Sequence, residues 1–250
     1  MKTVVLHTHL FIALCAVLLL SGSQSILQLK ALPFAYYMLV GMGTMVVYNL
    51  HRAYGLWGMP RDSWPPRFYN FYRLRFVNAI LSMVFIFIAS WLLYTTPRLW
   101  NWVLFPPILL VMLYILPMQN GRTLRQVPFL KIFIIAITWV WVTTFIPLMI
   151  EEKPFHLEQM GFLLHRLLFV FAITIPFDIR DIHSDQLDHV FTLPSYYGVE
   201  RSKRWAVLIA AGSFVPLPFL FESVPGSYLF AIMYLAVAII TLYGIRKSSP

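Results

Sequence analysis

The chain is poor in cysteine and in charge. Cys15 is the only cysteine among 250 residues, so a disulfide within the chain and a metal site built from cysteines are both excluded. Only 12% of the residues are charged, about half the share in a typical soluble domain. A P-loop, a serine nucleophile elbow, a zinc-protease helix and a dinucleotide fingerprint are also absent. The sequence therefore gives no motif-based support for a P-loop nucleotide-binding enzyme, a serine or zinc hydrolase, or a dinucleotide-dependent enzyme.

Apolar residues dominate instead. They make up 60% of the chain, and the mean hydropathy is +0.73. Apolar stretches of about 17–22 residues recur along the whole sequence, and each is long enough to cross a bilayer. We therefore predict an all-α integral membrane protein with one transmembrane domain over residues 1–250. Its bundle has about eight helices, expected near 4–21, 32–50, 76–96, 102–118, 129–150, 160–177, 205–221 and 226–245.

The first apolar stretch has two interpretations. A lysine, an apolar run and the small polar residues 21–25 are together typical of a cleaved signal peptide. His7, Thr8 and His9 interrupt the early part, however, and the apolar run is long. We expect a retained first helix, and a cleaved signal is the alternative.

Basic residues indicate how the chain is oriented in the membrane. Of the 19 lysines and arginines, 15 lie at the two ends or in the even-numbered connections between predicted spans, and three lie in the odd-numbered ones. The positive-inside rule then places both termini and the connections 51–75, 119–128 and 178–204 in the cytoplasm. We expect a bacterial inner membrane protein. Topology and anionic lipid headgroups explain the net charge of +9, so no nucleic-acid partner is expected.

Acidic residues are concentrated at the start of the third of these connections. Of ten acids in the chain, four lie within eleven positions, at Asp178, Asp181, Asp185 and Asp188. On one continuous helix these spacings place all four within an arc of about 80°. Two carboxylates about 5 Å apart repel by roughly 3 kcal/mol at an effective dielectric of 20, and a cation such as Mg²⁺ would relieve this. The alternative is a solvated acidic face of a cytoplasmic helix.

The residues that follow the cluster extend the pattern. The run Asp178-Ile-Arg-Asp181-Ile-His-Ser-Asp185, with Thr192-Leu193-Pro194 and Gly198-Val199-Glu200 after it, resembles the second aspartate-rich motif of the UbiA superfamily of membrane prenyltransferases. The similarity is to the menaquinone, chlorophyll and tocopherol branches. A glycine that the family carries at or near Asp188 is absent.

Two further matches are weaker. Asn49 fits the asparagine of the family's first motif and Arg52 fits a basic neighbour, but His51 and Ala53 stand where aspartates are expected. The nearest acid in that connection is Asp62. Pro128 and Lys131 at the start of the fifth span resemble a family proline and lysine, although a lysine there can also be an ordinary interfacial anchor.

The resemblance implies an activity and a set of site residues. The implied reaction moves a prenyl group from a polyprenyl diphosphate to an aromatic or lipid acceptor. Asp178, Asp181 and Asp185 would bind Mg²⁺, with Asp181 and Asp185 catalytic, while Asn49, Arg52 and Lys131 would bind the diphosphate.

Two observations support an alternative: the first motif lacks acids, and we predict eight spans where the family usually has nine. The chain would then be a catalytically degenerate UbiA-fold protein with a lipid-binding or partner role. A small transporter is a weaker option. His165 and Arg166 lie inside the sixth span, where either a functional or a structural role is open.

Overall fold

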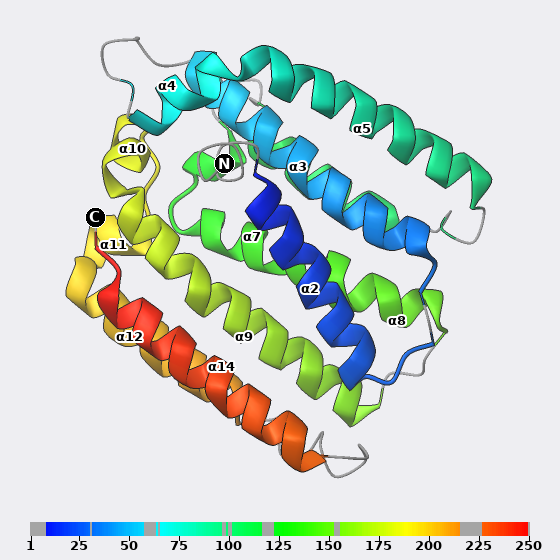
Figure 1. Cartoon of the computed structure of the whole chain (residues 1–250). Helices are drawn as coiled ribbons and strands as arrows, with labels where there is room; N and C mark the ends of the chain where they lie inside the picture. The colour runs from blue at the N-terminus through cyan, green and yellow to red at the C-terminus, as the bar shows by residue number, and fades with distance from the viewer. Residues whose placement is uncertain are drawn as a thin grey trace. The chain divides into compact units, whose positions relative to one another are not determined.

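The computed structural model describes residues 9–30, 32–57, 64, 66–96, 99, 102–116, 123–152, 156–215 and 227–249. Regular secondary structure within these ranges is entirely helical (Figure 1), which confirms the predicted all-α class. The chain divides into two compact units, residues 1–111 with 146–152 and residues 112–145 with 153–250. Each unit is described by itself.

The first unit is built around α3. Its helices are α2 (Leu10–Ile26), α3 (Phe34–Trp57), α4 (Pro66–Arg73), α5 (Arg75–Thr95), the short η3 (Trp102–Leu104), the start of α6 (Phe105–Ile115) and α8 (Ile146–Ile150). α3 packs against both α2 and α5. A Cβ atom on Gly41 would lie 3.3 Å from a methyl carbon of Val17, so the glycine allows α2 and α3 to approach closely.

α5 shows how this unit meets lipid. Its large apolar side chains are mostly exposed, including Phe76, Phe87 and Trp91, while Asn78 and Ser82 are buried. An exposed apolar face of this extent suits hydrocarbon rather than water. The side that packs on α3 is thus the more polar side of the helix.

The second unit is built around α9. Its helices are the 3₁₀ turn η4 (Leu124–Gln126), α7 (Leu130–Val140), the π-helical turn η5 (Trp141–Phe145), α9 (Leu157–Arg180), α10 (Ile182–Leu187), α11 (Leu193–Tyr197), α12 (Val199–Ser213) and α14 (Ser227–Lys247). α9 packs against α7, α12 and α14. The α9–α12 contact is close because α12 buries only small residues, at Ser202, Ala206, Ala210 and Ser213.

His165 on α9 has a structural contact. Its ring Nδ1 lies 2.6 Å from the backbone oxygen of Ser213, the last residue of α12. Carbonyls at the end of a helix have no partner within the helix, and a donor is needed where water is absent. This contact with the end of α12 supports the structural role for His165.

Several predicted spans correspond to long apolar helices. Arg75–Thr95, Leu130–Ile150 and Leu157–Arg180 are each long and apolar enough to cross a membrane, and Leu10–Ile26 and Trp102–Ile115 are shorter apolar helices. α12 begins at Val199, six residues before the span predicted from 205. Charged residues such as Arg201 and Arg204 end a membrane-embedded stretch but do not end a helix. The number of spans stays a prediction.

Candidate functional site

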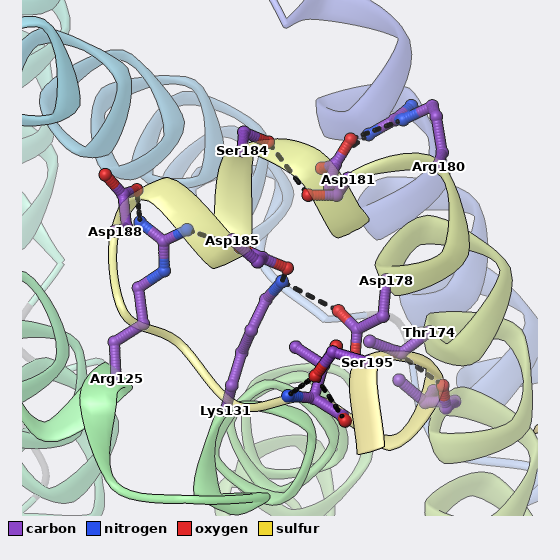
Figure 2. Close-up of polar contacts among 12 residues, drawn as sticks. Arg125, Lys131, Thr174, Asp178, Arg180, Asp181, Ser184, Asp185, Asp188 and Ser195 are labelled. Carbon is purple, nitrogen blue, oxygen red and sulfur yellow. Dashed lines mark hydrogen bonds and ion pairs between the residues drawn. The ribbon is translucent and has the colours of Figure 1, made fainter. Parts of the chain in front are cut away.

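The four aspartates do not share one helix face. α9 ends at Arg180, Asp181 separates it from α10, and Asp188 ends α10. Asp178 and Asp185 turn toward Lys131, whereas the Asp181 carboxylate turns toward Arg180 (Figure 2). The prediction of one continuous acidic face is therefore wrong. The physical reason is that the carboxylates have cations on two different sides, and the break at Asp181 lets each reach its own.

Lys131 is the central cation. It lies in the first turn of α7, and its Nζ is 2.7 Å from Asp178 Oδ1 and 2.6 Å from Asp185 Oδ2. The contact between Lys131 Nζ and Asp185 is a hydrogen bond. The contact with Asp178 Oδ1 is an ion pair whose geometry is not that of a hydrogen bond. Lys131 therefore lies beside two of the aspartates predicted to bind metal, while its role as a diphosphate ligand stays a prediction.

Arg125 on η4 is the second cation. It donates to Asp185 Oδ1 at 2.6 Å, and its other terminal nitrogen is 3.2 Å from Asp188 Oδ2. Lys131, Arg125, Asp178, Asp185 and Asp188 together form what we call the ion-pair network. Three carboxylates face two cations, so its formal charge is −1.

Burial makes each of these pairs necessary. The side chains of Asp178 and Asp185 are 2% and 1% exposed. An ion pair at about 2.6 Å attracts by roughly 6 kcal/mol at an effective dielectric of 20, which offsets a desolvation penalty of several kcal/mol per ion. Loss of Lys131 would take an ion-pair partner from both carboxylates, which is strongly destabilising.

The pKa values outside the spans agree with this picture. Burial raises the pKa of Asp188 above its usual value, and the charge of Arg125 opposes that rise. Burial alone would lower the pKa of Arg125, but Tyr114 and the carboxylates of Asp185 and Asp188 more than compensate and raise it. The guanidinium therefore keeps its proton at any physiological pH.

The backbone around Arg125 is fastened to the segment after α10. Gln126 Nε2 donates to the Asp188 carbonyl at 3.0 Å, and the Phe129 amide donates to the Phe191 carbonyl at 3.0 Å. Phe129 adopts a left-handed conformation, with φ +63°, immediately before α7 begins. These contacts hold Arg125 and Lys131 in place from outside the acidic segment.

Sequence reasoning missed Arg125 and Tyr114. It took Arg125 only as one of the charges that set orientation, although Arg125 shares the connection 119–128 with the residues just before Lys131. Tyr114, near the end of α6, interacts electrostatically with Arg125.

The later part of the motif forms backbone structure. Thr192 precedes α11. Its backbone amide donates a hydrogen bond to Ser195 Oγ at 2.9 Å, and Ser195 Oγ in turn donates to the Thr192 carbonyl. Gly198 has φ +84°, a conformation that favours glycine, and links α11 to α12. His189 has φ +56°, close to where the family's glycine is missing. These positions shape the turns that follow the aspartates.

The predicted first-motif residues lie in the other unit. Asn49 and Arg52 are on α3; Asn49 is 3% exposed and donates from Nδ2 to Ser82 Oγ at 3.2 Å. Asn78, 2% exposed, lies one turn before Ser82 on α5. Asp62 lies outside the described residues. The structure thus brings Asp178, Asp185 and Lys131 together, while the roles of Asn49 and Arg52 stay predictions.

The donor set can be tested against Mg²⁺. Among the described residues, no group of three or more acidic, histidine or cysteine side chains forms a metal cage. Oxygens of Asp178 and Asp185 nevertheless converge on one point, where the Lys131 ammonium lies. Mg²⁺ prefers oxygen ligands and commonly takes one or two carboxylates, with water and substrate phosphates as the rest. The residues fit a metal shared with a phosphate ligand.

Comparison with known proteins supports the fold. No protein-family model matches the sequence, and no curated protein matches it. A solved structure of a digeranylgeranylglyceryl phosphate synthase, studied for its biosynthesis in membranes, aligns with a TM-score of 0.55 at 15% identity. The alignment covers 98% of this chain and 86% of that chain. At 15% identity the alignment shows a shared fold, so the described part of this chain has the all-helical fold of that synthase.

Proposed function

We propose that this chain is an integral membrane prenyltransferase that moves a prenyl group from a polyprenyl diphosphate to an aromatic or lipid acceptor. The observation that carries the proposal is the placement of Lys131 between Asp178 and Asp185 in a UbiA-like fold. Carboxylates and cations held together in one buried cluster are what a metal–diphosphate group requires. The cytoplasmic location predicted from the basic residues would give this cluster access to a soluble diphosphate head.

Each residue has a role in this proposal. Asp178, Asp181 and Asp185 would hold Mg²⁺, which when bound would neutralise charge on the departing diphosphate. Asp181 would have to turn from Arg180 to join them. Lys131 has three donors and would exchange a carboxylate for a phosphate oxygen, and Arg125 would do the same from the other side of Asp185. That Asn49 and Arg52 bind the diphosphate stays a prediction from the sequence.

The reaction follows from this arrangement of charge. The bond between the prenyl C1 and the diphosphate oxygen breaks, and both electrons leave with the oxygen. Lys131 and Arg125 then stabilise the negative charge that develops on that oxygen, because they are already fixed in a buried site. The acceptor attacks the allylic cation and loses a proton, which completes the transfer.

A second candidate function is kept because of the first motif. His51 and Ala53 occupy the positions of its aspartates, so both acids of the first motif are missing from the sequence. A UbiA-fold protein that retains a diphosphate-binding site but not prenyl transfer would show this pattern. Such a protein would bind a lipid diphosphate, or serve a partner, without cleaving it.

The two candidates differ in one measurement. Purified protein in lipid nanodiscs is incubated with prenyl diphosphates of several chain lengths and an acceptor lipid extract, with and without Mg²⁺. Diphosphate release and binding are both followed. We expect Mg²⁺-dependent release that Asp185→Asn and Asp181→Asn abolish, and that Glu200→Gln, an exposed control, leaves unchanged. Binding without release would support the second candidate, and absence of both would overturn the proposal.

A further inference from the structure

We propose that Lys131 and Arg125 occupy the metal position in the resting protein, so that a divalent cation binds only together with a diphosphate. This inference rests on the proposed function for the identity of the ligand. It goes beyond that function because it makes the metal and the diphosphate one composite ligand. Neither would bind well by itself.

Both carboxylate oxygens of Asp185 face a cation. Oδ2 is 2.6 Å from Lys131 Nζ, and Oδ1 is 2.6 Å from an Arg125 terminal nitrogen. Both oxygens therefore already have cationic partners. A metal ion that arrives alone must displace at least one of these cations, because two positive charges cannot share the same oxygen at bonding distance without strong repulsion.

A cation that a metal displaces from Asp185 needs another anion. Lys131 is only 10% exposed, and within the described part of the chain its ion-pair partners are Asp178 and Asp185. Displacement by a metal would leave a buried ammonium without an anion, which is a strongly unfavourable state. A diphosphate brings new anionic oxygens for the ammonium. The metal can then take the carboxylates while Lys131 pairs with a phosphate.

A diphosphate without a metal also binds poorly. A diphosphate that arrives alone would place its negative charge beside Asp178, Asp185 and Asp188, whose two counter-ions leave the network at −1. Like charges at this distance repel, and a divalent cation removes that repulsion. Each ligand therefore supplies what the other lacks. Binding of the two is coupled, and by linkage the coupling is equal in both directions.

The experiment measures metal binding, independently of turnover. The full chain in nanodiscs is titrated with Mn²⁺, with free and bound ion distinguished by electron paramagnetic resonance. Inorganic pyrophosphate is present or absent, and empty nanodiscs correct for complexes in solution. For the unmodified protein, we expect pyrophosphate to tighten Mn²⁺ binding by roughly 5- to 150-fold, the usual range of coupling between two sites.

Removal of Lys131 or Arg125 should allow Mn²⁺ to bind without pyrophosphate. Lys131→Met exposes oxygens of Asp178 and Asp185, so Mn²⁺ should bind more tightly without pyrophosphate, and the added effect of pyrophosphate should shrink. Arg125→Met exposes one oxygen of Asp185 in a less buried position and is the second variant if Lys131→Met does not fold. Lys203→Met, which removes a lysine paired with the exposed Glu200, is the matched control and should behave as the unmodified protein.

The outcomes separate this inference from the proposed function. Equal Mn²⁺ affinity with and without pyrophosphate, or weaker Mn²⁺ binding in both cation variants, would overturn the inference even if prenyl transfer is observed. Coupled binding by a protein that transfers no prenyl group would support the inference and reject the proposed function. The two ideas can therefore fail separately.

Discussion

Loss of the Lys131 ammonium should strongly destabilise the protein. Asp178 and Asp185 each place an oxygen within 2.7 Å of Nζ, so the two oxygens are no more than about 5 Å apart. Without the cation, they repel by roughly 3 kcal/mol at an effective dielectric of 20, and two buried carboxylates lose their main counter-ion. We expect Lys131→Met to lower the free energy of unfolding by about 3–5 kcal/mol.

A second substitution tests the cause of that loss. Asp178→Asn in the Lys131→Met background removes one of the two repelling charges and leaves an amide that can hydrogen bond to Asp185. The double variant should therefore be more stable than Lys131→Met alone, by about 1–3 kcal/mol, which is the sign of direct coupling between the two residues. If Lys131→Met destabilised the protein only because methionine fills the space differently, Asp178→Asn would not restore stability.

The assay is reversible unfolding in mixed micelles of a mild detergent and dodecyl sulfate, followed by tryptophan fluorescence. Lys203→Met, whose partner Glu200 is largely exposed, should change the free energy by less than about 1 kcal/mol. The reasoning is refuted if Lys131→Met changes it by no more than this control. It is also refuted if Asp178→Asn lowers the stability of the Lys131→Met protein further.

Three further predictions use the same unfolding assay. Asp181→Asn should change the free energy of unfolding by less than about 1 kcal/mol, because its partner Arg180 is half exposed, and a larger loss would place Asp181 in the buried network. Arg125→Met should destabilise by about 1.5–3 kcal/mol, since it leaves Asp185 with one charged partner; an unchanged stability would contradict the contact. His189→Gly should stabilise by up to about 1 kcal/mol because residue 189 has a left-handed backbone, and destabilisation would argue against that conformation.

The helical class and part of the site could be predicted from the sequence. Apolar length is a direct requirement of the bilayer, so the long helices Arg75–Thr95, Leu130–Ile150 and Leu157–Arg180 fall close to their predicted spans. Lys131 was singled out by the family resemblance, and the predicted topology puts the end of the connection 119–128 on the same side of the membrane as the start of the connection 178–204.

The arrangement of the charges could not be predicted in the same way. The face of a helix is calculated on the assumption that the helix continues, and the break at Asp181 invalidates it. Arg125 gives no local signal, since its partners are 60 residues away in the sequence. The sequence offered a bound cation such as Mg²⁺ as one way to relieve the repulsion between the aspartates. It did not predict that Lys131 and Arg125 themselves pair with these carboxylates.

The order of charges in the ion-pair network limits how this protein can evolve. Asp178, Lys131, Asp185, Arg125 and Asp188 alternate in sign, and of the three carboxylates only that of Asp188, at one end, is partly exposed. A lineage can lose Asp188 first with little harm, but it cannot lose Lys131 unless an aspartate beside it is lost at nearly the same time. Among relatives, Lys131 should therefore change together with Asp178 or Asp185, and Asp188 should vary by itself.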